Sequence, residues 1–268
     1  MKHPNILYIH THDTGRFIQP YGYAVPTPRL QSFAEEGVVF RQAFSGGPTC
    51  SPSRACMLSG TCAHTNGMFG LAHFGFKMND YSKHLAQFLG CNGYETALSG
   101  FQHESADVED LGYHRVLEPK MDFDDPIRAQ FDAAATEQMR SPKNDIARAY
   151  AAKEFLQEKH DRPFFLSMGM FCTHRDFMDV LPGINPDYVK VPGPVFDTPQ
   201  SRHDYAQFLS MAAIADHAFG IVYDGLKASG HLDNTIVIFT TDHGIAFPFM
   251  KCRLYDDGIG VCLIMRFP

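Results

Sequence analysis

The chain has 268 residues, which is enough to bury a full hydrophobic core as one large domain or two small ones. It carries 30 acidic and 23 basic residues, and the formal net charge of −7 argues against a nucleic-acid-binding surface. Hydrophobic residues make up 44% and charged residues 20%, as in ordinary globular proteins. Because no apolar run approaches the length of a membrane span, we expect no membrane association.

The N-terminal residues are typical of a first strand and not of an export signal. Residues 6–10 (ILYIH) form an apolar run that is too short for the hydrophobic region of a signal peptide. The cysteines number 7, an odd count, and they follow no common disulfide or zinc-site spacing. We therefore expect reduced thiols and a cytoplasmic protein.

Predicted strands and helices alternate along the chain. The apolar runs predict strands at residues 6–10, 38–40, 94–98, 163–170, 235–240 and 260–267. Amphipathic or helix-favouring segments lie at residues 27–36, 81–91, 144–159 and 205–228, whereas irregular segments are expected at residues 104–140 and 181–199. Strands that are apolar on both faces and separated by helices predict a mainly parallel sheet covered on both faces, which is a three-layer α/β sandwich.

Polar residues follow four of the predicted strands. They lie at residues 10–13 (HTHD), at His103, at residues 173–175 (THR) and at residues 241–244 (TDHG). Ligands bind at the carboxyl ends of the strands in such sheets, so these groups are expected to meet at one site. Their convergence from four separate strand ends indicates an enzyme.

Residues 49–60 (TCSPSRACMLSG) predict a loop that becomes a helix. Ser51 suits the N-cap, Pro52 suits the first helical position, and the final glycine can end the helix. Cys50 would then lie just outside the helix N-terminus, where backbone N–H groups favour an anion, with Arg54 one turn further in. The residues predict a reactive group beside an oxyanion-sized pocket, and a cysteine nucleophile of lowered pKa also fits this description.

The run CSPSR at residues 50–54, followed by LSG at residues 58–60, resembles the signature of the type I sulfatases. The resemblance extends from residue 5 to residue 268 and is closest to the heparan N-sulfatase (sulfamidase) branch. It implies an alkaline-phosphatase-like fold and hydrolysis of sulfate esters or N-sulfo groups in a small sulfated carbohydrate. It also implies that a maturation enzyme converts Cys50 to formylglycine, whose hydrated aldehyde is the nucleophile.

The resemblance also implies a divalent metal site. Asp13, Asp242 and His243 are the expected ligands together with the modified Cys50, and the ion is usually calcium, with magnesium, manganese or zinc as alternatives. The family commonly has two consecutive aspartates after the first strand, whereas this chain has His12 before Asp13. His12 is expected either to bind the ion, which would favour manganese or zinc, or to orient Asp13 without touching the ion.

His103 and His174 match the two active-site histidines of the family, and Lys251 matches its second lysine. In the mechanism that the resemblance implies, Arg54 and Lys251 take up charge on the sulfuryl oxygens. His174 protonates the leaving group and His103 assists the release of sulfate, although the two histidine roles could be reversed. Phe101 stands where the family usually has lysine, so one positive charge is missing.

Two alternatives to an active sulfatase are considered. Family members continue beyond the last predicted strand with a smaller C-terminal domain, so residues 1–268 are expected to form the catalytic N-terminal domain alone. The chain could be a truncated or degenerate domain of little activity that acts as a binding module, and Gly260 and Cys262, where relatives more often have Arg and Pro, fit this interpretation. The other alternative is a phosphate or phosphonate ester hydrolase on the same scaffold.

Overall fold

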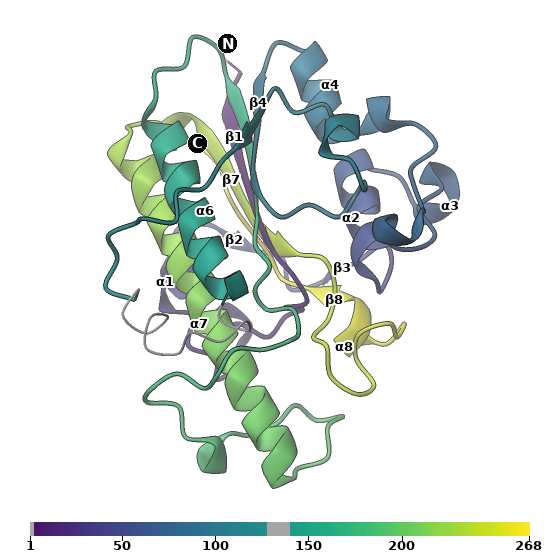
Figure 1. The fold of residues 1–268 in the computed structure, drawn as a ribbon, viewed down its shortest axis with the longest axis vertical. Helices are drawn as coiled ribbons and strands as arrows, with labels where there is room; N and C mark the ends of the chain where they lie inside the picture. The colour runs from purple at the N-terminus through teal and green to yellow at the C-terminus, as the bar shows by residue number, and fades with distance from the viewer. Residues whose placement is uncertain (1–2, 128–139) are drawn as a thin grey trace.

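The computed structural model describes residues 3–127 and 140–268, and its central feature is a seven-stranded sheet between two layers of helices (Figure 1). In spatial order the strands are β2 (Val38–Val39), β9 (Leu263–Arg266), β7 (Thr235–Thr241), β1 (Asn5–Thr11), β6 (Phe164–Gly169), β4 (Glu95–Gly100) and β5 (Arg115–Leu117). A separate two-stranded sheet pairs β3 (Ala43–Phe44) with β8 (Gly260–Val261).

The central strands run parallel, as the sequence predicts. Strands β7, β1, β6, β4 and β5 pair in parallel, whereas β9 pairs antiparallel with both β7 and β2. The single strand predicted at residues 260–267 is divided between the two sheets, as β8 and β9. The division occurs at Cys262, whose backbone N–H donates to the carbonyl of Gly15 and whose carbonyl accepts from the hydroxyl of Thr240.

Helices cover both faces of the central sheet, which confirms the predicted three-layer α/β architecture (Figure 1). One layer contains α1 (Pro28–Glu35), α6 (Arg140–Gln157) and α7 (Pro199–Ala228), and the other contains α2 (Cys50–Ser59), α3 (Ala63–Asn66) and α4 (Leu85–Cys91). Alternate side chains of β1 pack against the two helix layers. Leu7 and Ile9 belong to the core under α6 and α7, whereas Tyr8 belongs to the core under α2 and α4.

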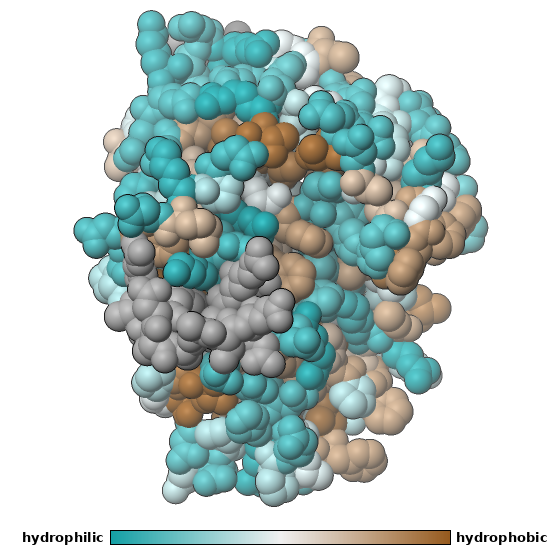
Figure 2. All heavy atoms as spheres, viewed as in Figure 1, coloured by the Kyte–Doolittle hydropathy of each residue, from teal (hydrophilic) through white to brown (hydrophobic). Residues whose placement is uncertain are grey.

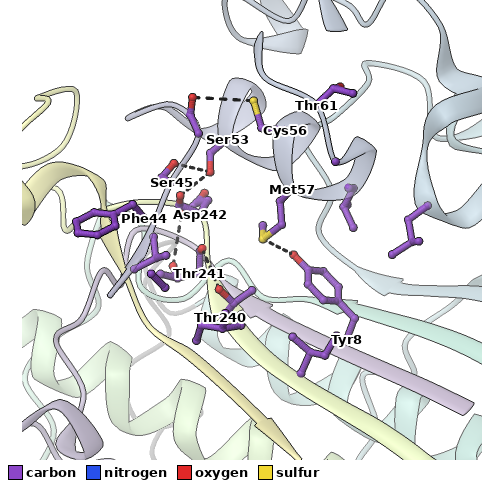
Figure 3. A pocket seen from close by; sticks show the side chains of 18 of the residues that line it. Tyr8, Phe44, Ser45, Ser53, Cys56, Met57, Thr61, Thr240, Thr241 and Asp242 are labelled. Carbon is purple, nitrogen blue, oxygen red and sulfur yellow. Dashed lines mark hydrogen bonds between the residues drawn. The ribbon is translucent and has the colours of Figure 1, made fainter. Parts of the chain in front are cut away.

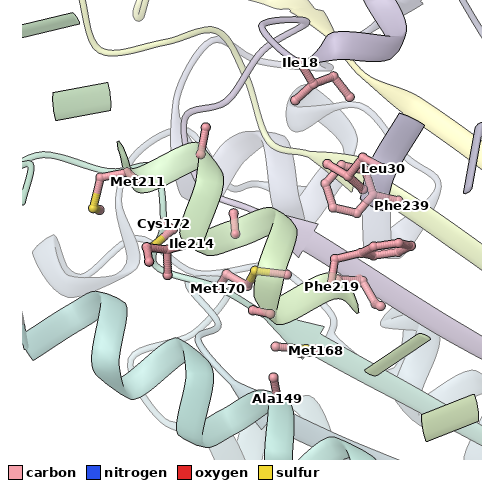
Figure 4. Packing of buried hydrophobic residues seen from close by; sticks show 14 of the residues in the cluster. Ile18, Leu30, Ala149, Met168, Met170, Cys172, Met211, Ile214, Phe219 and Phe239 are labelled. Carbon is pink, nitrogen blue, oxygen red and sulfur yellow. The ribbon is translucent and has the colours of Figure 1, made fainter. Parts of the chain in front are cut away.

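The larger core is held together by aromatic contacts between α7 and its neighbours. Phe219 of α7 packs edge-to-face against Phe239 of β7, with 5.4 Å between ring centroids, and lies 5.1 Å from the ring of Phe33 in α1. Figure 4 shows Phe219 and Phe239 side by side, with Leu30 of α1 next to them. This contact fixes α1 and α7 against the strand that leads into residues 241–244.

The helix predicted at the CSPSR run is α2, and it begins two residues earlier than expected. Thr49 and not Ser51 is the N-cap, so Cys50 is the first helical residue. The hydroxyl of Ser51 instead accepts a hydrogen bond from the backbone N–H of Ala72 at 3.0 Å. Gly60 ends the helix in the left-handed conformation with φ of 65°, as predicted.

Other predicted boundaries change where a side chain offers a better hydrogen bond. The helix expected at residues 81–91 is a short 3-10 turn followed by α4, because the imidazole of His84 accepts the backbone N–H of Ala86 and starts a new helix. Helix α7 begins six residues before the expected start, at a capping box formed by Thr198 and Ser201. Strand β5 lies in the segment predicted to be irregular, and residues 128–139 of that segment lie outside the described residues.

The molecular face shown in Figure 2 is mainly hydrophilic, with apolar residues in smaller areas between the polar ones. Within residues 3–127 and 140–268, no helix is both long enough and apolar enough to cross a bilayer. All seven cysteines are free thiols, which agrees with the expectation of reduced cysteines.

The aromatic contact between α7 and β7 leads to a stability prediction. We expect Phe219→Ala to lower the free energy of unfolding by about 3–5 kcal/mol, because a fully buried ring is replaced by a cavity. The matched control is Phe196→Ala, at a ring that is 79% exposed, for which we expect a change below about 0.5 kcal/mol. Urea unfolding followed by circular dichroism measures both, and equal losses would contradict this assignment of the core.

Candidate active site

The carboxyl ends of three neighbouring strands meet the start of α2. Asp13 follows β1, His174 follows β6, and Asp242 and His243 follow β7. Because β1 pairs with both β6 and β7, these residues are brought together by the strand order itself. The backbone N–H of Asp13 donates to Asp242 Oδ1 at 2.8 Å, which links the ends of β1 and β7 directly.

Around this junction lie two overlapping groups of side chains whose possible ligand atoms are within 4.8 Å of one another. One group is Asp13, Cys50, Asp242 and His243, and the other is His12, Asp13, Cys50 and His174. Cys50 Sγ lies 3.0 Å from His12 Nε2 and 3.4 Å from His243 Nε2. The structure therefore brings together all five residues that the sequence resemblance suggested as metal ligands, and it adds His174 to their surroundings.

The chemistry of this cluster fits a divalent cation. Asp13 Oδ1 is buried without a hydrogen-bond partner among the described residues, and it lies 3.2 Å from His243 Nε2 and 3.5 Å from His12 Nε2. Carboxylate oxygens and imidazole nitrogens that converge in a buried space are the donor types that calcium, manganese and zinc accept. Asp13 also has φ of 60°, a left-handed conformation that turns its carboxylate into the cluster.

Asp242 and Arg54 form a buried ion pair at the base of the cluster. Arg54 is fully buried, and its Nε and Nη2 atoms each lie 3.1 Å from Asp242 Oδ2, while its Nη1 lies 2.9 Å from His10 Nδ1. Burial alone would raise the pKa of Asp242, but His243, His12 and Arg54 together outweigh it and hold that pKa well below the usual range. Asp242 is therefore an ionised carboxylate in the folded chain.

Lys251 contacts the cluster at Asp13, whereas Arg54 contacts it at Asp242. Its Nζ donates to Asp13 Oδ2 at 2.6 Å, and His174 Nε2 lies 3.8 Å from the same oxygen. Burial would lower the pKa of Lys251, but the attraction of Asp13 and neighbouring anionic groups outweighs it and raises that pKa above the usual value. The ammonium group therefore remains charged beside the possible ligand atoms.

The thiol of Cys50 is not activated by its surroundings. Burial and the carboxylates of Asp242 and Asp13 raise its pKa to about 12, and this effect exceeds the opposing influence of Lys251 and Arg54. The alternative of a lowered-pKa cysteine nucleophile, which the helix N-terminus and Arg54 suggested from the sequence, is therefore wrong for the chain's own groups.

His103 lies at the edge of the site, next to a histidine that sequence reasoning missed. Its Nε2 shares a hydrogen bond of 2.8 Å with Nδ1 of His73, and the two rings are nearly parallel. Its ring centroid is 6.2 Å from that of His12. No local pattern singles out His73, because its role depends on a contact with a residue thirty positions away.

Phe101 lies between Arg54 and His12, the histidine that follows β1. Its ring stacks on that of His12 at 5.1 Å between centroids, and the guanidinium carbon of Arg54 lies 5.3 Å from the ring centroid. The aromatic ring of Phe101 thus lies at the position where the resemblance implies a lysine.

A cavity of about 560 Å³ lies on the other side of α2, between this helix and the sheet (Figure 3). Its lining is largely apolar and includes Tyr8 and Met57, which are joined by a hydrogen bond of 3.1 Å from the Tyr8 hydroxyl to Met57 Sδ. Of the possible metal ligands within the described ranges, only Asp242 lines it. Among the described residues, the cavity and the cluster therefore share Asp242 alone.

Comparison with solved structures shows that other proteins share this layered fold. A putative sulfatase from Bacteroides thetaiotaomicron aligns with a TM-score of 0.75 and 20% identity, covering 100% of this chain and 65% of that one. The phosphonate monoester hydrolase of Agrobacterium radiobacter aligns with a TM-score of 0.70 and 18% identity, covering 99% of this chain and 68% of that one. At these identities the likeness concerns the fold.

The sequence comparisons define the family. The family model described as Sulfatase matches residues 4–268. Human N-sulphoglucosamine sulphohydrolase is 30% identical over 275 residues, covering 91% of this chain and 51% of the relative. The chain belongs to the sulfatase family, and its similarity to the human enzyme agrees with the expected likeness to the sulfamidase branch. It spans about half the length of the curated relatives it matches.

The surroundings of His103 lead to a prediction for its protonation. Burial, followed by Arg54 and His73, lowers the pKa of this imidazole from 6.5 to about 4. In NMR titrations of the metal-free chain, the His103 ring signals should therefore stay constant from about pH 7.5 to about pH 5 and change below that range. Free imidazole in the same sample is the control, and a midpoint above about pH 6 would show that the ring is more solvated than described.

Proposed function

We propose that the chain is a catalytic sulfatase unit that hydrolyses sulfate esters or N-sulfo groups. The observation that carries the proposal is the position of Cys50 at the first residue of α2, with its Sγ 3.0 Å from His12 and 3.4 Å from His243. Cys50, the first residue of the CSPSR run, thereby lies inside the group of possible metal ligands. The name of the human relative, N-sulphoglucosamine sulphohydrolase, supports a sulfated sugar as the substrate.

Asp13, Asp242, His243 and His12 would hold a divalent cation together with residue 50. A bound cation would neutralise charge on the sulfate group and lower the pKa of an attacking hydroxyl. We place His12 among the ligands because its Nε2 lies within 3.5 Å of Asp13, Asp242 and Cys50. Two imidazole donors beside two carboxylates suit manganese or zinc as well as calcium.

Formylglycine at position 50, formed by a maturation enzyme, would supply the nucleophilic hydroxyl that the thiol cannot provide. The remaining roles fall to charged and titratable groups of the chain. Arg54 and Lys251 would balance negative charge on the sulfuryl oxygens, because both carry positive charge next to the cluster. His174 would protonate the leaving group, since its Nε2 faces Asp13 Oδ2 at 3.8 Å, and His103 would assist the release of sulfate.

The first test concerns the nucleophile. Mass spectrometry of the peptide that contains Cys50 should show an aldehyde in place of the CH₂–SH group when the chain is produced with a formylglycine-generating enzyme. The same preparation should hydrolyse glucosamine N-sulfate or a sulfate ester, and Cys50→Ala should abolish this turnover. Cys56→Ala, on the same helix, is the matched control and should retain turnover.

Three results would contradict this assignment. Equal turnover by Cys50→Ala and the unsubstituted chain would remove residue 50 from the chemistry. Hydrolysis of a phosphonate monoester without hydrolysis of any sulfate would favour the alternative phosphate or phosphonate ester hydrolase. A modified chain that binds sulfated sugar without turnover would favour a binding module.

The second test concerns the cation. Asp13→Asn should weaken binding of Ca²⁺ or Mn²⁺ by about tenfold or more in isothermal titration, because it removes a buried anionic ligand. Asparagine tolerates the left-handed backbone of Asp13, so the turn itself should persist. Asp216→Asn, at a buried carboxylate in α7, is the control and should leave the affinity unchanged. Equal cation affinity in all three chains would exclude Asp13 as a ligand.

A further inference from the structure

A short segment after α3 is fastened to the rim of the candidate site at two points. The segment forms the 3-10 turn η2 (Ala72–Phe74). The backbone N–H of Ala72 donates to the hydroxyl of Ser51, next to Cys50, and Nδ1 of His73 shares a hydrogen bond with Nε2 of His103. The turn is thereby joined both to the first turn of α2 and to the histidine that follows β4.

This turn presents an aromatic ring to solvent. Phe74 is 73% exposed, and its ring centroid lies 4.2 Å from that of His73 at an angle of 55°. Gly75 follows in the left-handed conformation, with φ of 88°, and its N–H donates to the carbonyl of Ala72, which closes the turn. The backbone that carries the ring is therefore closed into a turn, while most of the ring remains open to solvent.

Further apolar rings lie close by in the sequence. Phe69 and Phe76 are also exposed, and Phe76 packs over Gly70 so closely that a side chain at that glycine would overlap its ring. Figure 2 shows apolar residues gathered at the edge of the molecule where Figure 1 places α3 and the turns after it. An exposed aromatic group beside a polar, charged site is typical of a ligand-binding surface.

We propose that Phe74 is the stacking surface for a pyranose ring of the substrate, and that His73 holds it in position against His103. The proposal rests on the proposed sulfatase function and identifies where the sugar lies. A pyranose has an apolar face of C–H groups and polar edges, so it can cover Phe74 while its polar edge faces the histidines that lead to the charged cluster. The path from Phe74 through His73 and His103 to His12 is continuous in ring contacts.

The occupant is identified by the size and polarity of the surface. The Phe74 ring, in contact with the imidazole of His73, matches one sugar ring, whose hydroxyl groups can bond to a histidine nitrogen. Nδ1 of His73 is engaged by His103, so its Nε2 is the nitrogen that faces such a hydroxyl. Arg54 and Lys251 supply the complementary positive charge deeper in the site.

The experiment compares two probes in the Cys50→Ala background, in which no turnover occurs, with Ca²⁺ present. The probes are glucosamine N-sulfate and inorganic sulfate, and isothermal titration measures each dissociation constant. We expect Phe74→Ala to weaken binding of the sugar about threefold to tenfold, because an aromatic contact is lost, and to leave binding of inorganic sulfate unchanged. Phe74→Tyr keeps the ring and should bind both probes normally.

Phe88→Ala is the matched control, because Phe88 is 57% exposed on α4 and should affect neither probe. Unchanged sugar affinity in Phe74→Ala, or a parallel loss of both probes, would overturn the sugar subsite and leave the sulfatase proposal standing. Binding of inorganic sulfate without any binding of the sugar would also overturn the subsite. If the Phe74-containing chain bound neither probe, the proposed sulfatase function itself would be contradicted.

Discussion

The carboxylate of Asp242 is the group on which the arrangement of the site depends. Its Oδ1 accepts backbone N–H groups from Asp13 and His243, and its Oδ2 accepts from the side chain of Arg54. These bonds connect the ends of β1 and β7 with α2, and all of them require an acceptor that carries negative charge or free lone pairs. A protonated or missing carboxyl at this position would leave a buried guanidinium and two strand-end amides without their partner.

Charge is concentrated around Asp242 to a degree that a buried region rarely tolerates. The side chains of Asp13 and Asp242 are fully enclosed, and Lys251 pairs with Asp13 while Arg54 pairs with Asp242. Asp242, Arg54 and Lys251 keep their charge in the interior because each has an oppositely charged partner, whereas burial holds the pKa of the His12 imidazole well below its usual value. The folded chain therefore keeps a set of charged and neutral donors in fixed positions before any ligand arrives.

Much of this organisation is predictable from the sequence, because strong local patterns encode it. The apolar runs that became β1, β6 and β7 are continuous, and parallel strands place the residues after them at one edge of the sheet. Sequence reasoning failed where long-range contacts decide the outcome. The N-cap of α2, the pairing of His73 with His103 and the raised pKa of Cys50 all depend on residues far away in the sequence.

The burial of Cys50 has a consequence for when an enzyme could modify this residue. Its side chain is only 3% exposed, and it is enclosed by residues from β1, β7 and α2 that meet only in the folded state. An enzyme that alters this residue needs access to the Cβ and Sγ atoms, which the finished fold denies. The modification proposed here would therefore have to take place before the chain has finished folding, while the side chain of residue 50 is still accessible.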